Sequence, residues 1–213
     1  IHVAPDLIVC LSDFYNYEAE KGKGSLILKK YGVDTDKRII CFQTHRHFFL
    51  GNEHELLREL QYVQETLDYE VIFMPIGYCH GDDYSLRWLS SIAATPFKYI
   101  PAYSIYDMIS ILAASDAFVG TSLHGNITAF SFGLPHVFGP AAIDKAEGFL
   151  EIAGLPKELK MGNWSELSEK LEFAFSLDKD SICQKLNESK RRVHATFEEL
   201  TTVYASDSAS RIA

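Results

Sequence analysis

The chain has 213 residues, of which 47% are hydrophobic and 23% are charged, and its formal net charge is −9. This composition is typical of a globular protein with a buried core, and it excludes a disordered chain. An acidic surface repels phosphate backbones, so the charge disfavours a nucleic-acid partner. A small anionic substrate stays open, provided that the fold gathers cationic side chains locally.

The cysteines indicate neither a metal centre nor a redox motif. Cys10, Cys41, Cys79 and Cys183 are far apart and form no CxxC pair. Zinc sites and redox motifs pair their cysteines closely, so we expect four reduced thiols and no metal. Reduced thiols are typical of a cytoplasmic protein.

The sequence contains no run of the roughly 18 apolar residues that a transmembrane helix needs, and no signal peptide. We therefore expect no transmembrane segment and a cytoplasmic location, with peripheral contact with the inner face of a membrane left open. The chain starts without Met, inside an apolar stretch, residues 1–9, that reads as a strand. From this start we expect that an N-terminal domain is missing.

Between residues 38 and 153, apolar runs of strand length recur with helix-length segments between them. The predicted strands cover residues 38–43, 71–76, 99–100, 117–120 and 136–138. The predicted helices cover residues 53–68, 83–94, 104–115, 125–132 and 142–153. Continuous apolar strands are covered on both faces, and repeated strand-then-helix order implies a parallel sheet with right-handed crossovers. The prediction is an α/β fold, a Rossmann-like parallel sheet with helices on both faces, whose ligands lie beyond the carboxyl ends of the strands.

The remainder is predicted to be mostly helical, with helices between about residues 165 and 204. Ser165 is read as the cap of the first of them, and residues 205–213 are expected to fray. We expect residues 1–213 to form one domain.

The strongest local feature is Thr121-Ser122-Leu123-His124-Gly125, which stands between a predicted strand and a predicted helix. A helix start offers free N–H groups and partial positive charge, and Gly125 would let an anion approach the backbone. His124 can donate a hydrogen bond or act as a general acid near neutral pH. A purely structural role as a helix cap is an equal alternative on these residues alone.

The motif continues with Gly133-Leu134-Pro135 and then Asp144-Lys145. In order and spacing, the stretch from Asp116 to Phe138 resembles the signature of the polysaccharide pyruvyltransferase family. The weaker strand and helix pattern from Asp6 to about Ala153 resembles the later half of that family's proteins.

The resemblance implies the C-terminal half of a two-domain fold similar to the GT-B glycosyltransferases. It implies transfer of a pyruvyl group from phosphoenolpyruvate, with no cofactor, to a hydroxyl of a sugar or lipid-linked oligosaccharide in exopolysaccharide biosynthesis. His124 would be the catalytic acid. The donor's anionic groups would meet Thr121, Ser122, Leu123, Gly125 and Asn126.

The chain departs from the family at Ser122, where many members have Arg. Serine cannot bind a carboxylate or phosphate in the bidentate way that arginine does. Compensating cations could be Arg46, His80 or Lys145, which follow other predicted strands. For each of them, a solvated surface position is the alternative.

Two further loops border the expected site. Gln43-Thr44-His45-Arg46-His47 offers cationic side chains, although His45 and His47 lack an obvious third metal ligand. In the loop after the second strand, Asp82 is read as a helix cap.

Two other functions stay open. One is a glycosyltransferase that uses a nucleotide-sugar, for which Glu147 is the nearest candidate to bind the ribose. The other is a non-catalytic binding or assembly module. As a part of a transferase, the chain is expected to be inactive alone.

Overall fold

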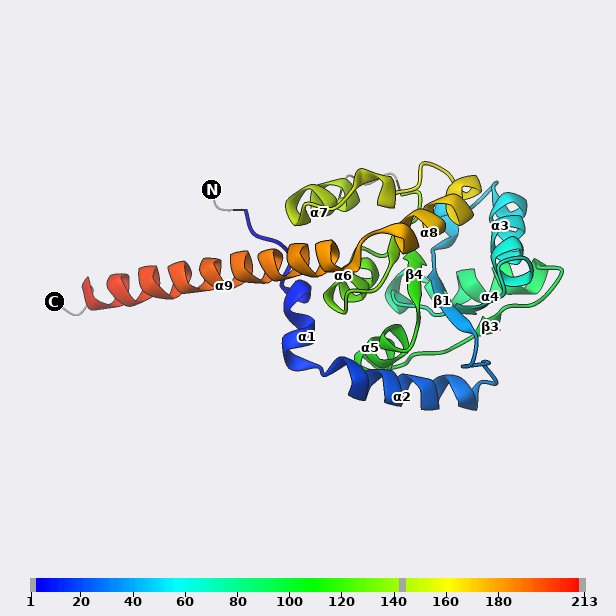
Figure 1. Ribbon diagram of the computed structural model, residues 1–213, viewed down its shortest axis with the longest axis horizontal. Helices are drawn as coiled ribbons and strands as arrows, with labels where there is room; N and C mark the ends of the chain where they lie inside the picture. Colours follow the sequence, from blue (N-terminus) through cyan, green and yellow to red (C-terminus); the bar gives the residue numbers. More distant parts are fainter. Residues whose placement is uncertain (1–2, 142–144, 211–213) are drawn as a thin grey trace.

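The computed structural model describes residues 3–141 and 145–210. Its centre is a five-stranded parallel sheet with the strand order β3-β2-β1-β4-β5 (Figure 1). The strands are β1 (Arg38–Gln43), β2 (Tyr69–Phe73), β3 (Lys98–Tyr99), β4 (Ala117–Gly120) and β5 (His136–Phe138). The predicted Rossmann-like parallel sheet is confirmed.

Helices cover both faces of the sheet, as Figure 1 shows. The α-helices are α1 (Leu11–Phe14), α2 (Tyr17–Lys30), α3 (Glu53–Glu65), α4 (Asp82–Ile92), α5 (Ile105–Ala113), α6 (Leu123–Ser131), α7 (Lys145–Ala153), α8 (Leu167–Ser176) and α9 (Lys179–Ser210). Within the described residues, short 3-10 helices join them: η1 (Leu7–Cys10), η2 (Arg46–Phe48), η3 (Tyr78–His80), η4 (Lys157–Leu159) and η5 (Trp164–Glu166).

The strands are apolar throughout because both of their faces are buried. Ile40 and Phe42 pack into a core with α3, α4, α7 and α8, whereas Ile39 and Cys41 pack into a second core with α2 and α5. Successive side chains of a strand point to opposite faces, so a strand between two helical layers needs an apolar residue at every position.

The strand order creates a switch point between β1 and β4. From β1 the chain winds outward through β2 and β3, and then returns to the other side of β1 as β4. Gln43 and Gly120, at the carboxyl ends of these two strands, lie side by side in the register of the sheet. In open parallel sheets, ligands bind in the crevice beyond such a switch point.

The beginning of the chain differs from the prediction. Instead of a strand, residues 7–14 form η1 and α1, and residues 1–2 lie outside the described part. The Asp6 carboxylate accepts a hydrogen bond from the Ile8 N–H at 2.9 Å, which favours a helical turn. Val9 and Cys10 are buried in the first core, so their apolar character reflects burial of a turn and not a strand.

Helix α2 was not predicted from the sequence. Its apolar positions are sparse and it contains Gly22 and Gly24, both of which weaken a helix signal. Tertiary packing against α5 stabilises it, because Leu28 and Gly24 are buried there.

The carboxyl-terminal helices were predicted, but with errors at their ends. Asn163, not Ser165, provides the cap, by accepting a hydrogen bond from the Ser165 N–H, and α8 starts only at Leu167. Helix α9 continues to Ser210, where fraying from residue 205 was expected, because the segment contains neither glycine nor proline to end it.

Other elements match within a few residues. Ser104 caps α5 as predicted, since its Oγ accepts a hydrogen bond from the Asp107 N–H at 3.1 Å. The second strand ends at Phe73, before Pro75, which has no N–H to donate to a neighbouring strand. The predicted helix 142–153 is observed from Lys145, and residues 142–144 lie outside the described part.

Candidate functional site

A cavity of about 670 Å³ opens at the carboxyl edge of the sheet, beside the β1–β4 switch point. Loops that follow β1, β2, β4 and β5 all contribute to it, as the sequence predicted. Among the described residues, its polar and glycine lining comprises Gln43, His45, His47, Gly77, Cys79, His80, Asp82, Thr121, Ser122, His124, Gly139 and Lys145. Leu123 belongs to the apolar part of the lining.

Gln43 holds the three nearest loops in place. Its Nε2 donates to Asp82 Oδ2 at 2.7 Å, and its Oε1 accepts from the Ser122 N–H at 2.9 Å. The same Asp82 oxygen accepts the Gly77 N–H at 2.7 Å. Gln43 and Asp82 are buried, so this network gives the floor of the cavity one fixed geometry.

The network corrects one reading. Asp82 does not cap α4 with its side chain, because the N-cap is Gly81 and makes no side-chain bond. The Asp82 carboxylate instead faces back toward the loop after β2. Its role is structural, as expected, but through a different contact.

Helix α6 begins directly behind the motif, with Ser122 as its N-cap. The Ser122 Oγ accepts the Gly125 N–H at 3.1 Å. In the part of the chain that the structure describes, the N–H groups of Leu123 and His124 have no acceptor. Two free amides and the positive end of the helix therefore border the cavity, which is a favourable setting for an anion.

The His124 imidazole is exposed at the rim of the cavity. Its side chain is 65% exposed, and its Nε2 lies 3.8 Å from Asp6 Oδ2. At this distance the carboxylate can pair with a protonated ring and orient it. An exposed ring with a carboxylate partner is free to meet a reactant, which a core histidine is not.

Gly125 and Asn126 support the site from below. Both are buried and neither lines the cavity. A Cβ on Gly125 would lie 2.5 Å from Phe118 and 2.7 Å from Ile76, so glycine is required there by packing and not by an approaching anion. Asn126 Nδ2 donates to the carbonyl groups of Gly120 and Ser122, which ties the strand end to the helix start.

The predicted cations divide into two groups. His80 and Lys145 line the cavity, together with His45 and His47. Arg46 does not line it: its guanidinium lies 5.0 Å from the centre of the Trp88 ring. Arg46 can reach a ligand in the cavity only if its side chain leaves that ring.

Glu147, the candidate for binding a ribose, is engaged elsewhere. Its carboxylate lies 2.6 Å from Lys160 Nζ, and this hydrogen bond lowers the pKa of Glu147. Glu147 is not among the residues that line the cavity.

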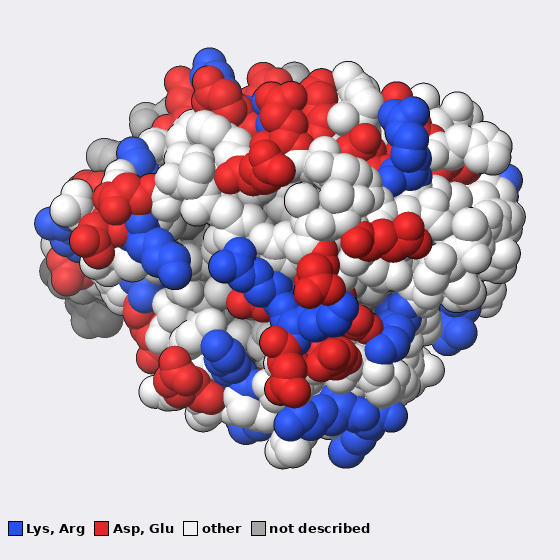
Figure 2. Space-filling model, turned by 45° about the vertical axis from the view of Figure 1, so that its right-hand side comes forward, with Lys and Arg blue, Asp and Glu red and all other residues white. Residues whose placement is uncertain are grey.

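The charges on one face of the molecule do not form an obvious binding track. On the face that Figure 2 shows, acidic and basic side chains are interspersed, and acidic groups are densest along the upper edge. This face has no continuous basic stripe of the kind that follows a nucleic-acid backbone.

A second cavity, of about 510 Å³, lies at the opposite edge of the sheet and includes Arg38, Asp116 and His136.

Two contributors to the site were missed in the sequence. Asp6 gave no signal, because nothing local indicates that the first segment passes beside α6. Gln43 was seen only as part of a loop, although a polar residue at the end of an apolar strand is the type of signal that could have identified it.

The fold and the cavity define the class of the protein: a Rossmann-like domain that corresponds to one half of a GT-B-like fold. It is similar to the UDP-GlcNAc 2-epimerase of Methanocaldococcus jannaschii (TM-score 0.58, 14% identity, 84% of this chain and 49% of that chain). It is also similar to the wall teichoic acid polymerase TagF (TM-score 0.52, 14% identity, 96% and 51%). The chain thus spans about half of each protein.

A third similar structure is a single domain, the C-terminal CMP-Kdo binding domain of WaaA from Acinetobacter baumannii (TM-score 0.50, 12% identity), of which the match covers 98%. Comparison with curated protein sequences found no match. The family profile of the polysaccharide pyruvyl transferases matches residues 1–138, and the chain therefore belongs to this family. The matched residues include His124 and end before Lys145.

Within the described residues, no helix combines the length and the hydrophobicity needed to cross a bilayer.

Proposed function

We propose that the chain binds phosphoenolpyruvate and supplies the catalytic acid for transfer of its pyruvyl group to a sugar hydroxyl. One observation carries the proposal. In a chain with a net charge of −9, the cavity at the switch point gathers four histidines and Lys145 beside the free amides of α6. Among the described residues that line the cavity, the one carboxylate is that of Asp82, and neighbouring N–H groups already bind it.

The donor carries a phosphate and a carboxylate, and the site offers partners for anions. The N–H groups of Leu123 and His124, the Ser122 hydroxyl and Lys145 are the donors that we assign to these groups. Distributed donors of this kind substitute for the arginine that many members have in place of Ser122, and they need no rearrangement during the reaction.

The chemistry requires an acid beside the donor's double bond. A protonated His124 would transfer its proton to the methylene carbon, leaving the adjacent carbon electron-poor. One sugar hydroxyl adds to that carbon, and a second hydroxyl displaces inorganic phosphate. The products are a pyruvate ketal and phosphate, and the protons of the two hydroxyls restore the acid and leave with phosphate or solvent. The exposed position of His124 leaves room for an acceptor.

The acceptor would be a sugar or lipid-linked oligosaccharide, and a second domain would bind it. The reaction would take place in the cytoplasm, as a step in the assembly of a cell-surface polysaccharide. Because the chain spans about half of TagF and of the epimerase, we expect it to bind the donor but not to complete the reaction alone.

Titration calorimetry of the chain tests the choice of donor. Phosphoenolpyruvate is expected to bind, and to bind more tightly than inorganic phosphate because its carboxylate adds contacts. Preferential binding of a UDP-sugar or a CMP-sugar would instead support a transferase that uses a nucleotide-sugar. The fold similarity to the CMP-Kdo binding domain is the reason to test this alternative. Binding of none of these ligands would contradict both and favour a non-catalytic module.

Substitutions separate binding from chemistry. In the protein that joins this chain to its acceptor domain, His124→Ala should lower phosphate release by about 10²-fold or more, the usual contribution of a general acid. The fold and donor binding should be retained, because the ring is exposed. His54→Ala, an exposed histidine on α3, is the matched control. Undiminished turnover in His124→Ala would remove this residue from the mechanism.

The two candidate cations give a second comparison. Lys145→Ala should weaken donor binding more than Arg46→Ala does, because Lys145 lines the cavity and Arg46 stacks on Trp88. Neither change should alter the thermal midpoint much. Unchanged binding in both variants would dismiss both assignments.

A further inference from the structure

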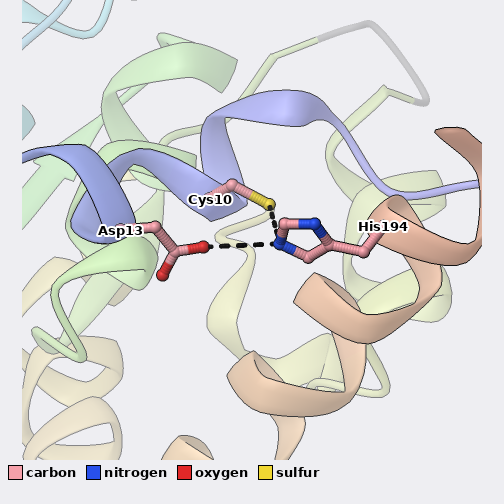
Figure 3. A group of neighbouring side chains, drawn as sticks. All are labelled: Cys10, Asp13 and His194. Atoms are coloured by element: carbon pink, nitrogen blue, oxygen red, sulfur yellow. Dashed lines mark hydrogen bonds and ion pairs between the residues drawn. The ribbon is translucent and has the colours of Figure 1, made fainter.

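Three side chains that could bind a metal converge where the first helical turns meet α9. They are Cys10, Asp13 and His194, and Figure 3 shows them pointing toward one another. Cys10 Sγ lies 4.0 Å from His194 Nε2, and Asp13 Oδ2 lies 3.6 Å from the same nitrogen. All three candidate ligand atoms lie within 4.8 Å of one another. None of these residues lines the cavity described above.

The geometry does not suit a cysteine nucleophile. In a Cys-His-Asp triad the imidazole uses one nitrogen for the thiol and the other for the carboxylate. Here a single atom, His194 Nε2, faces both partners, and it cannot donate one hydrogen to each. Burial also raises the pKa of Cys10, whereas a nucleophilic thiol needs a lowered one.

We propose that Cys10, Asp13 and His194 bind a zinc ion, with water as the fourth ligand. Sulfur, imidazole nitrogen and carboxylate oxygen are the donors that zinc takes in proteins. Ideal zinc bonds in a tetrahedron place the donor atoms about 3.4–3.6 Å apart. The S–N separation of 4.0 Å and the N–O separation of 3.6 Å are close to that arrangement and need only a small contraction.

The surroundings hold the carboxylate in place for such an ion. Lys190 Nζ lies 2.5 Å from Asp13 Oδ1 and 2.8 Å from Ser12 Oγ, which leaves Oδ2 facing His194. A thiolate and a carboxylate neutralise the dication, so only the charge of Lys190 remains at the site. Zinc binding replaces the thiol proton of Cys10, which passes to the solvent.

The site is also open to water. Cys10 is buried, but the side chains of Asp13 and His194 are 36% and 64% exposed, so an ion can enter and retain a water ligand. Cys10 and His194 are 184 residues apart in the chain. A bound ion would therefore fasten α9 to the beginning of the chain. This role is separate from that of the cavity at the switch point, which we call the donor cavity because we propose that it binds phosphoenolpyruvate.

Cobalt and zinc titrations test the site. Co²⁺ should bind at one equivalent with a thiolate-to-cobalt charge-transfer band and intense visible bands of tetrahedral cobalt, and Zn²⁺ should displace it. His194→Gln should raise the dissociation constant for Zn²⁺ more than tenfold, about 1.4 kcal/mol. Because His194 is exposed, this variant keeps the fold. His54→Gln and Cys183→Ser, which change an exposed histidine and an exposed cysteine elsewhere, should bind like the parent protein.

Binding through other residues would overturn the proposal. Cys10→Ala should abolish the charge-transfer band. If the band persists in this variant, another thiol binds the cobalt. Tight binding that survives His194→Gln but is lost in His45→Gln or His47→Gln would place the metal in the donor cavity. Absence of binding to the parent protein at micromolar Zn²⁺ would also refute it.

A structural measurement locates the ion independently. Zn²⁺ should slow amide hydrogen exchange in η1, α1 and the part of α9 around His194, and raise the thermal midpoint, in the parent but not in His194→Gln. Slowed exchange confined to the start of α6 would contradict the assignment.

Discussion

His136 is a residue whose surroundings change its chemistry. It is buried, its Nδ1 lies 3.0 Å from the Leu134 carbonyl oxygen, and its Nε2 has no partner in the described part of the chain. Burial lowers the pKa of His136 from 6.5 to about 4. The folded protein therefore holds this ring neutral, between the aromatic rings of Phe130 and Phe138.

This shift makes stability depend on pH in a defined window. Between pH 6.5 and pH 4 the unfolded chain binds a proton at His136 that the folded chain does not, so stability falls as the pH is lowered. From pH 7 to pH 5 the loss should be about 2 kcal/mol. Urea unfolding at the two pH values measures it, and His136→Leu, which cannot be protonated, should reduce the difference. An equally large pH effect in that variant would assign it to other groups.

At the scale of elements, the contact between α2 and α5 depends on one glycine. A Cβ on Gly24 would lie 1.9 Å from the Ser110 carbonyl oxygen, whereas a Cβ on Gly22 would meet nothing within 4 Å. Near this contact, the buried Glu20 accepts the Ser110 hydroxyl at 2.6 Å. The close approach of the two helices thus depends on the absence of a side chain at Gly24.

Substitution by alanine at these two glycines should have opposite effects on the stability of the protein. Gly24→Ala should destabilise the protein by about 1–3 kcal/mol, since overpacking forces the helices apart. Gly22→Ala should be neutral or stabilising by up to about 1 kcal/mol, because alanine is the better helix former. Denaturant unfolding compares them directly. If both variants lost stability equally, the close packing at Gly24 would not be the cause.

At the scale of the whole molecule, α9 reaches well beyond the sheet and its helices, as Figure 1 shows. Its first part is anchored, since Leu186 and Val193 are buried in the core with the sheet. Phe197 and Leu200 are each 48% exposed. Stability should therefore depend on the first half of α9 and hardly on the second.

Shortened chains test this division. A chain that ends at Thr196 should keep its thermal midpoint nearly unchanged. A chain that ends at Lys185 loses the burial of Leu186 and Val193 and should be destabilised by about 3 kcal/mol or more. A large loss on removing only residues 197–213 would show that the distal part of α9 packs against the molecule.

Much of the architecture followed from local pattern. All five strands and most helices were predicted, and the start of α6 was predicted at Gly125, two residues after its observed start at Leu123. Buried parallel strands and helix starts leave local signals in the sequence. Helix α2 and the helical turns of residues 7–14 were not, because packing and not local periodicity stabilises them.

The sequence by itself determined the layered α/β fold and the position of the His124 motif at the carboxyl edge of the sheet. Only the tertiary structure decided that Asp6 faces His124, that Arg46 turns to Trp88, and that Cys10 and Asp13 meet His194. The physical reason is range: strand and helix periods repeat over a few residues, whereas contacts between distant side chains depend on the path of the whole chain.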